Sequence, residues 1–401
     1  MIKELKKGQT LLIKGPARVE LLEGTIEVFG WLFDSKSAET SSVIVPGANL
    51  YPFYAVQKSK AEIYTKSEEN IEIIKDNTIS SKWVEIKDAL IDQISKHKGK
   101  IPLKIMVLGI SSGKTTLIKF LANSFLRAGK KGGYLDSDLG QQLIYLPTTL
   151  NIAEIDSPIV SSEDIESEDT VFIGATFPKG NFKYILAHAC LDLIEKYIEK
   201  HKDADDFILI DTDGWVKQGE TSVIYKNFFI DMVDPDVVIA FHNEEIEELK
   251  IIEENARKRK DRTVFLIEES NAYFYDKDKE ERRFLRQSQF ARILEQYRKM
   301  SIPLDDIKFI KNEYDKEKKE ITEVEIDIND LENLPYHYVI VALLTENSEL
   351  IKVGLLFYIN REKNYILLFS DFSFKEQLRI KKILLGSLRL STKGNFQGYL
   401  Y

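Results

Sequence analysis

The chain has 401 residues, of which 43% are hydrophobic and 30% are charged. This length, roughly two to three typical domains, predicts a multidomain globular protein, and the composition excludes disordered, collagen-like and low-complexity classes. The 56 Lys and Arg residues and 65 Asp and Glu residues give a net charge of −9, which disfavours a protein that coats nucleic acid non-specifically but allows a confined basic channel.

From residue 8 to about residue 64 the sequence reads as short alternating strands separated by Gly, Pro and Asn turns. Such a pattern is typical of a small all-β module of the sandwich or barrel type, and we expect this domain over residues 1–80. The predicted strands are residues 10–13, 17–21, 25–29, 43–45 and 61–64. The polar stretch 66–81 is predicted to be a linker or a connecting hairpin.

The pattern changes in the middle of the chain. Residues 103–108 form a continuous apolar run, as expected of a strand buried on both faces. Further buried strands (133–136, 170–174, 206–211, 236–241 and 263–267) alternate with helical stretches (84–96, 115–127 and 182–201). Alternating strands and helices predict a parallel α/β sheet over residues 81–320. From about residue 320 strands return (338–344, 351–358 and 365–369), which predicts a β-rich third domain over residues 321–401.

The sharpest local signal follows the first buried strand. A Gly-rich turn runs from Gly109 to Gly113, and Lys114-Thr115 opens a helix. This is the arrangement of a phosphate-binding loop, in which backbone N–H groups hold the phosphates, the Lys reaches the β/γ oxygens and the Thr ligates Mg²⁺. The usual spacing puts four residues between the glycines, whereas here there are three. The alternative is an ordinary glycine turn with a surface lysine. The predicted nucleotide-binding residues are Gly109, Ser111, Ser112, Gly113, Lys114, Thr115 and Thr116.

About twenty residues later, Asp136 and Asp138 follow the next predicted strand. Carboxylates at this place can hold Mg²⁺ through water or act as a general base toward a hydroxyl nucleophile. The alternative is a solvated turn rich in Asp.

Two further features point to a ligand. Trp215 lies just past the end of a third buried strand, where α/β proteins bind ligands and where an exposed indole can stack on a base. Arg282 and Arg286 are four residues apart on one helix face, from which arginines can close over a transferring phosphoryl group. The alternatives are a Trp that fills the core and a solvated basic helix.

Other chemistries find no support in the sequence. None of the five histidines shows metal-ligand spacing, and no Gly-x-Ser-x-Gly elbow or Cys/His pairing is present. The Asn-Lys-x-Asp signature of guanine-specific proteins is also absent. The single cysteine, Cys190, allows no intrachain disulfide, as is typical of a reducing compartment. With no apolar run long enough for a membrane span and a charged N-terminus, we expect a cytoplasmic protein without a membrane partner.

Taken in order, these motifs resemble those of the polynucleotide 5′-hydroxyl kinases, a family that includes the kinase subunit of the pre-mRNA cleavage complex, ribosomal-RNA-processing kinases and archaeal relatives. The resemblance covers nearly the whole chain. Its motifs are residues 24–30 and 46–48, Gly-Lys-Thr at 113–115, Asp138-Leu139-Gly140-Gln141, 174–178 with Asn181, 212–216, and Arg282-Arg283 with Arg286.

The resemblance implies a role for each matching residue. Lys114 would bind the β/γ-phosphates, and Thr115 would ligate Mg²⁺ with Asp136 supporting its water shell. Asp138 would orient and deprotonate the attacking 5′-hydroxyl. The residues implied in substrate binding or in the lid are Gln141, Thr176, Pro178, Thr212, Trp215, Arg282 and Arg286.

The sequence therefore predicts an α/β fold in which a central P-loop parallel sheet is flanked by a β-sandwich-like domain and a small β-rich C-terminal domain. The predicted function is an ATP- and Mg²⁺-dependent kinase of 5′-hydroxyl ends of RNA, and also of DNA, with RNA-processing proteins as partners. The shortened loop leaves open an ATP-binding scaffold of an RNA-processing complex. A small-molecule nucleoside kinase is disfavoured by the Trp and by the flanking β domains.

Overall fold

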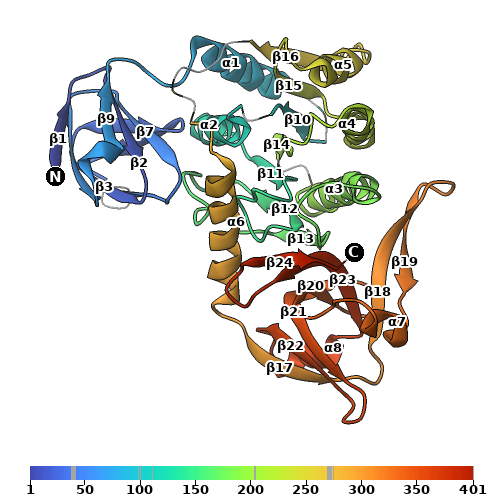
Figure 1. Cartoon of the computed structure of the whole chain (residues 1–401). Helices are drawn as coiled ribbons and strands as arrows, with labels where there is room; N and C mark the ends of the chain where they lie inside the picture. The colour runs from blue at the N-terminus through green and yellow to red at the C-terminus, as the bar shows by residue number, and fades with distance from the viewer. Residues whose placement is uncertain are drawn as a thin grey trace.

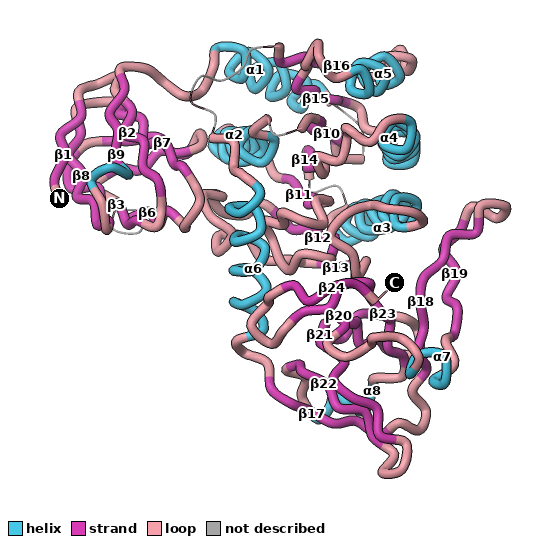
Figure 2. Tube along the Cα trace, in the orientation of Figure 1, coloured by secondary structure: helices cyan, strands magenta, loops and turns pink. Residues whose placement is uncertain are grey.

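A computed structural model describes residues 1–37, 42–97, 99, 101–110, 112–202, 205–268, 273 and 275–400. Three modules are visible in Figure 1: a blue N-terminal β module at the left, a central module of helices around a sheet, and a red C-terminal β module below it. Figure 2 shows that most of the helices surround the central sheet, while the two outer modules consist mainly of strands. The expected α/β class with β modules at both ends is confirmed.

The N-terminal module is a sandwich of two antiparallel sheets, in the order β1-β8-β3-β6 and β5-β4-β7-β2-β9. Burial alternates residue by residue along β7 and β8, because one face of each strand packs inward. The stretch expected to be a linker or hairpin contributes β9, which pairs with β2. The elements are β1 (Ile2–Leu5), β2 (Thr10–Lys14), β3 (Ala17–Glu23), β4 (Thr25–Val28), β5 (Trp31–Asp34), β6 (Ser42–Val45), β7 (Leu50–Ala55), β8 (Ser59–Thr65), η1 (Glu68–Asn70) and β9 (Ile71–Ile74).

The central module is a seven-stranded sheet in the order β13-β12-β11-β14-β10-β15-β16. Its five strands from β11 to β16 run parallel, and β10 lies between β14 and β15. The predicted parallel sheet is present, and at one edge it is extended by β12, which pairs antiparallel with β11 and with β13. The strands are β10 (Leu103–Leu108), β11 (Gly132–Asp136), β12 (Thr149–Glu154), β13 (Asp169–Phe172), β14 (Phe207–Asp211), β15 (Val237–Phe241) and β16 (Thr263–Ile267).

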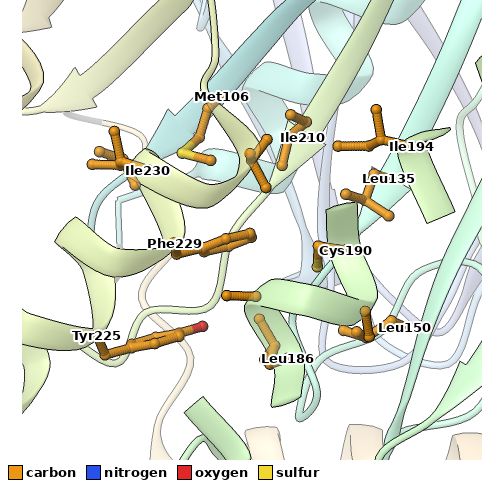
Figure 3. Packing of buried hydrophobic residues seen from close by; sticks show 14 of the residues in the cluster. Met106, Leu135, Leu150, Leu186, Cys190, Ile194, Ile210, Tyr225, Phe229 and Ile230 are labelled. Carbon is orange, nitrogen blue, oxygen red and sulfur yellow. The ribbon is translucent and has the colours of Figure 1, made fainter. Parts of the chain in front are cut away.

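Helices cover both faces of this sheet: α1 and α2 lie on one side, and α3, α4 and α5 on the other (Figure 1). The side chains between the sheet and α3 and α4 form one apolar core, in which Phe229 and Cys190 meet Met106, Ile210 and Leu186 (Figure 3). The helices are α1 (Ser81–Lys96), α2 (Lys114–Arg127), α3 (Phe182–Lys200), α4 (Glu220–Val233), α5 (Glu247–Ala256) and α6 (Lys279–Leu294). Within the described residues, no helix is both long and apolar enough to cross a bilayer.

The C-terminal module is one sheet in the order β17-β22-β21-β20-β23-β18-β19, and β24 adds to β23. Two of its strands precede residue 321 and a third begins at residue 320, so we infer that this module starts near residue 298, whereas the sequence predicts residue 321. Apolar residues are few in these strands and lie among charged and polar ones, so the sequence shows no clear strand pattern there. The elements are β17 (Arg298–Pro303), β18 (Lys308–Asp315), β19 (Glu320–Glu325), α7 (Ile328–Glu332), β20 (Val339–Leu344), β21 (Leu350–Asn360), β22 (Tyr365–Ser370), α8 (Phe374–Arg379), β23 (Lys382–Leu390) and β24 (Phe396–Tyr399).

Candidate active site

The loop between β10 and α2 needs glycine at both of its ends. Gly109 has a φ of +151° and Gly113 a φ of +87°, a region that L side chains rarely adopt. A Cβ on Gly109 would lie 2.5 Å from Ser112 Oγ and 2.9 Å from Phe241 Cβ. The Ser112 hydroxyl is buried and has no partner in the part of the chain that the structure describes. Ser111, a predicted nucleotide-binding residue, lies outside the described residues.

Lys114 is the first residue of α2, and its side chain turns back into the loop. Its Nζ donates to the Gly109 carbonyl oxygen at 3.0 Å, and the residue is only 9% exposed. The ammonium and the N–H groups of the first helical turn therefore lie at one place, since Gly113 caps α2 and these N–H groups have no helical carbonyl to bond. A fixed cation beside a helix N-terminus is suited to bind phosphate oxygens.

Thr115 and Asp211 link the loop to the neighbouring strand. Asp211 is the last residue of β14 and pairs in register with Val107 of β10. Thr115 Oγ1 donates to Asp211 Oδ2 at 2.7 Å, whereas Asp211 Oδ1 is buried without a partner among the described residues. Burial raises the Asp211 pKa to about 6, and the charge of Lys114 opposes that rise. A hydroxyl and an unpartnered buried carboxylate oxygen, side by side, fit the oxygen ligands that Mg²⁺ prefers.

Asp211 is a residue that the sequence interpretation missed, although a signal was present. The signal is a run of four apolar residues that ends in this Asp, as a buried strand would; only the structure shows that this strand neighbours the P-loop strand. The predicted carboxylate, Asp136, ends β11 and is also buried. Its oxygens accept the backbone N–H groups of Asp138 at 3.2 Å and Leu143 at 2.5 Å. Burial and then the charge of Asp211 raise the Asp136 pKa well above its usual range.

Asp138 lies in the turn that follows β11. Its Oδ1 accepts the N–H groups of Gly140 at 2.9 Å and Gln141 at 3.0 Å, which fix the carboxyl group at the end of the strand. Burial, and then the charge of Asp213, raise the Asp138 pKa, while Lys114 opposes the rise. Asp138 therefore shares an electrostatic environment with the loop lysine, and its carboxylate is a stronger base than an exposed one.

The segment after β14 is held by a buried ion pair that sequence analysis did not identify. The Asp213 carboxylate accepts hydrogen bonds from the Tyr225 hydroxyl, from the Lys226 ammonium at 3.0 Å and from the backbone N–H of Trp215 at 2.8 Å. Thr212 is fully buried, and its hydroxyl donates to the Val107 carbonyl at 2.7 Å, so this side chain faces the sheet. Trp215 is half-buried and meets the Tyr225 ring edge-on at 5.9 Å.

The loop after β13 brings the predicted substrate contacts to the same end of the sheet. The Thr176 carbonyl oxygen would lie 3.1 Å from a Cβ on Gly140, next to the Asp138 turn. Thr176 is half-buried and Pro178 is buried. At the start of this loop, Gly174 meets Gly386 so closely that a Cβ on Gly174 would lie 2.4 Å from the Gly386 Cα. This contact attaches the C-terminal module to the loop.

Helix α6 crosses in front of the central sheet between the two outer modules (Figure 1). Gln141 Nε2 donates to the Arg282 carbonyl at 3.3 Å, and Arg286 Nη1 lies 4.0 Å from the position of a Cβ on Gly140. The Arg282 guanidinium also donates to Asp276 at 2.6 Å. Both predicted lid arginines are therefore on the helix that covers the Asp138 turn. The start of α6 is tied to the N-terminal module, because Lys14 donates to Glu281 at 3.2 Å.

The N-terminal module docks on α2, the helix that begins at the P-loop. Asn123 Nδ2 donates to the Phe29 carbonyl at 2.8 Å, and Arg127 donates to the Gly30 carbonyl at 2.7 Å. These residues, with Lys119, recur every four positions and so lie on one face of α2. The module is thereby fixed beside the nucleotide loop.

Comparisons with known proteins agree with this architecture. The sequence model of a family described as the P-loop of mRNA cleavage and polyadenylation factor CLP1 matches residues 109–296. A protein of Methanocaldococcus jannaschii named polyribonucleotide 5′-hydroxyl-kinase is 28% identical over 81% of this chain and 98% of its own length. A Pyrococcus furiosus protein of the same description is 32% identical, but over only 52% of this chain and 55% of its own length.

One solved structure is similar to this chain over nearly its whole length. It is described as a complex of wild-type Clp1p with a segment of Pcf11p. The TM-score is 0.75, the sequence identity is 14%, and 97% of each chain is covered. At that identity the similarity concerns the fold, and it extends over all three modules.

Proposed function

We propose that the chain is an ATP- and Mg²⁺-dependent polynucleotide 5′-hydroxyl kinase, because the model of the CLP1 P-loop family matches its residues 109–296. It transfers the γ-phosphate of ATP to the 5′-hydroxyl end of RNA, and also of DNA. One observation carries the proposal: the loop lysine, the Thr115–Asp211 pair and the Asp138 carboxyl meet at the carboxyl edge of the sheet. The names of the relatives from M. jannaschii and P. furiosus support the choice of acceptor.

In this reaction Lys114 and the N–H groups at the start of α2 hold the β- and γ-phosphates. Thr115 and Asp211 hold Mg²⁺, which when bound neutralises charge on the phosphate oxygens. Asp136 supports the arrangement through its bonds to the 138–143 turn. These residues act mainly by positioning and by electrostatics, as is usual for phosphoryl transfer.

Asp138 is the proposed general base. The 5′-hydroxyl oxygen forms a bond to the γ-phosphorus, the bond from that phosphorus to the β–γ bridging oxygen breaks, and ADP leaves. The hydroxyl proton passes to the Asp138 carboxylate. Arg282 and Arg286 on α6 then stabilise the negative charge on the transferring group, since α6 lies over the turn that carries Asp138.

The acceptor strand is held next to these groups. Trp215 offers an aromatic face at the end of β14 for the first base, and Thr176 and Pro178 line the neighbouring loop. Thr212, which the family resemblance places in the same clasp, is proposed as a positioning residue instead. Its hydroxyl is bonded to Val107, so it holds the start of the 212–216 segment.

The proposal is tested by transfer of labelled γ-phosphate to a 5′-hydroxyl oligonucleotide. Asp138→Asn keeps the shape of the side chain but removes the base, so kcat is expected to fall by about 10²- to 10⁴-fold while ATP binding persists. Asp192→Asn, at an exposed site on α3, is the matched control and retains activity. Turnover of Asp138→Asn close to that of the parent chain would overturn the assignment.

A second candidate is an ATP-binding scaffold of an RNA-processing complex that transfers no phosphate. The three-residue spacing between Gly109 and Gly113 favours it, because a shorter loop offers one N–H fewer to the phosphates. Measurable ATP binding without any labelled oligonucleotide supports the scaffold. Insertion of one residue between these glycines then tests the loop directly, since it should raise transfer if the spacing is the cause. Competition by free nucleosides, but not by oligonucleotides, would instead indicate a nucleoside kinase.

RNA-processing proteins are the proposed partners. The solved structure with the same fold is described as a complex of Clp1p with Pcf11p, which makes a protein-binding role reasonable for this architecture. A cytoplasmic location stays a prediction from the single cysteine.

A further inference from the structure

A second cluster of ligand-type side chains lies at the edge of the central sheet opposite the P-loop. Glu154 is the last residue of β12 and pairs with Gly133, near the start of β11. His201 caps the C-terminal end of α3, and Asp205 lies just before β14 begins. The P-loop and the Asp138 turn follow the carboxyl ends of these parallel strands, whereas this cluster lies at their amino ends.

The donor atoms of the cluster converge. One ligand atom each from Glu154, His201 and Asp205 lies within 4.8 Å of the other two. The His201 Nε2 atom faces both Glu168 oxygens, at 2.9 and 3.0 Å. Its Nδ1 atom is 3.7 Å from Asp205 Oδ2, which is too long for a hydrogen bond. The imidazole is therefore held by Glu168 through one nitrogen, and its other nitrogen faces a carboxylate.

Asp205 supplies an independent reason to expect a cation. Its side chain is only 2% exposed, and its Oδ2 accepts the Tyr197 hydroxyl at 2.5 Å. Its Oδ1 is buried and has no hydrogen-bond partner in the described ranges of the chain. A buried carboxylate oxygen without a partner is costly, and a cation at the point where these donors converge would satisfy it.

The charge of the cluster leads to the same conclusion. Three carboxylates, those of Glu154, Glu168 and Asp205, surround the imidazole, and the ammonium of Lys200 pairs with Glu168. With a neutral imidazole, two negative charges are left without a counter-charge. A divalent cation would neutralise both.

We propose that this chain binds one divalent transition-metal ion, of the Zn²⁺ type, through His201 Nδ1 and the carboxylates of Glu154 and Asp205. An imidazole with two carboxylates is a donor set that suits Zn²⁺, and water completes the coordination. Glu168 accepts the Nε2–H of His201 and so orients the ring, as carboxylates commonly do for metal-bound histidines. The ion joins the end of α3 to β12 and to the start of β14. Sequence spacing does not reveal the site, because Glu154 belongs to a separate strand.

The test is a metal titration of the full chain after chelator treatment, in excess Mg²⁺ so that oxygen-only sites are already filled. Co²⁺ serves as a spectroscopic probe of the imidazole-containing site, and Zn²⁺ is followed by calorimetry. One equivalent of Zn²⁺ is expected to bind and to raise the melting temperature. The Co²⁺ form is expected to show visible absorption bands that Zn²⁺ abolishes.

Variants identify the ligands. Glu154→Gln, at an exposed side chain, and His201→Gln are each expected to weaken Zn²⁺ binding. Glu168→Gln, outside the ligand set, should weaken it by about 10- to 100-fold. His242→Gln is the matched control, because His242 Nδ1 pairs with Glu253 at 2.8 Å but belongs to no such cluster among the described residues. Its Zn²⁺ binding should equal that of the parent chain.

Two results would overturn the proposal. The first is the absence of Zn²⁺ binding by the parent chain. The second is equal Zn²⁺ affinity in the parent chain and in both Glu154→Gln and His201→Gln. Neither result bears on phosphate transfer, which takes place at the opposite edge of the sheet.

Discussion

Lys119→Met is expected to remove most of the pH dependence of the free energy of unfolding that arises where the N-terminal module packs on α2. Lys119 lies on α2 and is only 7% exposed. Its Nζ donates to the Val160 carbonyl at 2.7 Å and lies 5.2 and 5.4 Å from the ring centroids of Phe29 and Tyr51, which belong to the N-terminal module. An ionisable group thus sits inside a contact between two modules.

The magnitude follows from the pKa of this amine. Burial, and then the charge of Lys277, lower the Lys119 pKa from 10.5 to about 7. Between these values the unfolded chain holds the proton and the folded chain does not, so the free energy of unfolding rises with pH across the window. At about 1.4 kcal/mol per pH unit, the rise is at most about 5 kcal/mol. The two aromatic rings stabilise the ammonium by about 1 kcal/mol or more, which makes this rise in the free energy of unfolding smaller.

The assay is urea unfolding followed by far-UV circular dichroism at several pH values from 6 to 10. Below pH 7 the parent chain must bury a charged Lys119, so Lys119→Met should be the more stable form there. Near pH 10 the order reverses, because the variant loses the hydrogen bond from Lys119 to the Val160 carbonyl, worth about 0.5–1.5 kcal/mol, although the Tyr51 hydroxyl still donates to that carbonyl. The control is Lys131→Met, at an exposed lysine, which should follow the parent chain. Parallel pH profiles for Lys119→Met and the parent chain would refute the reasoning.

Three further predictions concern the lid, the acceptor strand and the C-terminal module. Arg286→Ala should lower kcat by about 10³-fold or more with little change in ATP affinity. Steady-state transfer measures kcat and nucleotide titration measures the affinity, and an unchanged kcat would exclude a lid role. The affinity for a 5′-hydroxyl oligonucleotide should fall with salt at a shallow logarithmic slope of about −2, because few phosphates are contacted; a steep slope contradicts this. Gly174→Val should lower the free energy of unfolding by about 1–3 kcal/mol, because a Cβ there would overlap Gly386 and because φ at Gly174 is +77°. Urea unfolding measures this loss, and an unchanged unfolding midpoint would contradict the contact.

Local patterns predicted most of the central module. The apolar run at β10, the Gly-Lys-Thr that opens α2 and the strand ending before Asp138 each depend on neighbours in sequence, and the structure has them in the expected places. The Thr115–Asp211 contact joins positions 96 residues apart. To predict this contact one must know that β14 lies next to β10 in the sheet, and no local sequence pattern gives the order of the strands. The sequence interpretation therefore chose Asp136, the carboxylate closer in sequence to the loop.

The edges of the sheets were harder to predict for a related reason. Strand β12 pairs antiparallel with β11 and with β13, and both β12 and β13 follow β11 without an intervening helix. In β19 only two of six residues are apolar and three are charged, since that strand is at the sheet edge and partly exposed. Side chains at an edge need not be apolar on both faces, so the composition there resembles that of a loop. Such strands are also the reason why the sequence predicts a C-terminal domain from residue 321, whereas the strands of its sheet begin at residue 298.

The carboxyl edge of the central sheet explains how a chain with a net charge of −9 can bind a nucleic acid. Three of the cations there already have partners inside the protein: Lys226 pairs with Asp213, Arg282 with Asp276, and Lys114 donates to Gly109. A surface with its cations paired in this way releases few counterions when a strand binds, so it cannot hold a long polynucleotide by charge. It can hold one end of a strand, where a single aromatic face and a few directed hydrogen bonds are sufficient. An acidic chain and a nucleic-acid substrate are therefore compatible when the substrate is recognised by its 5′ end.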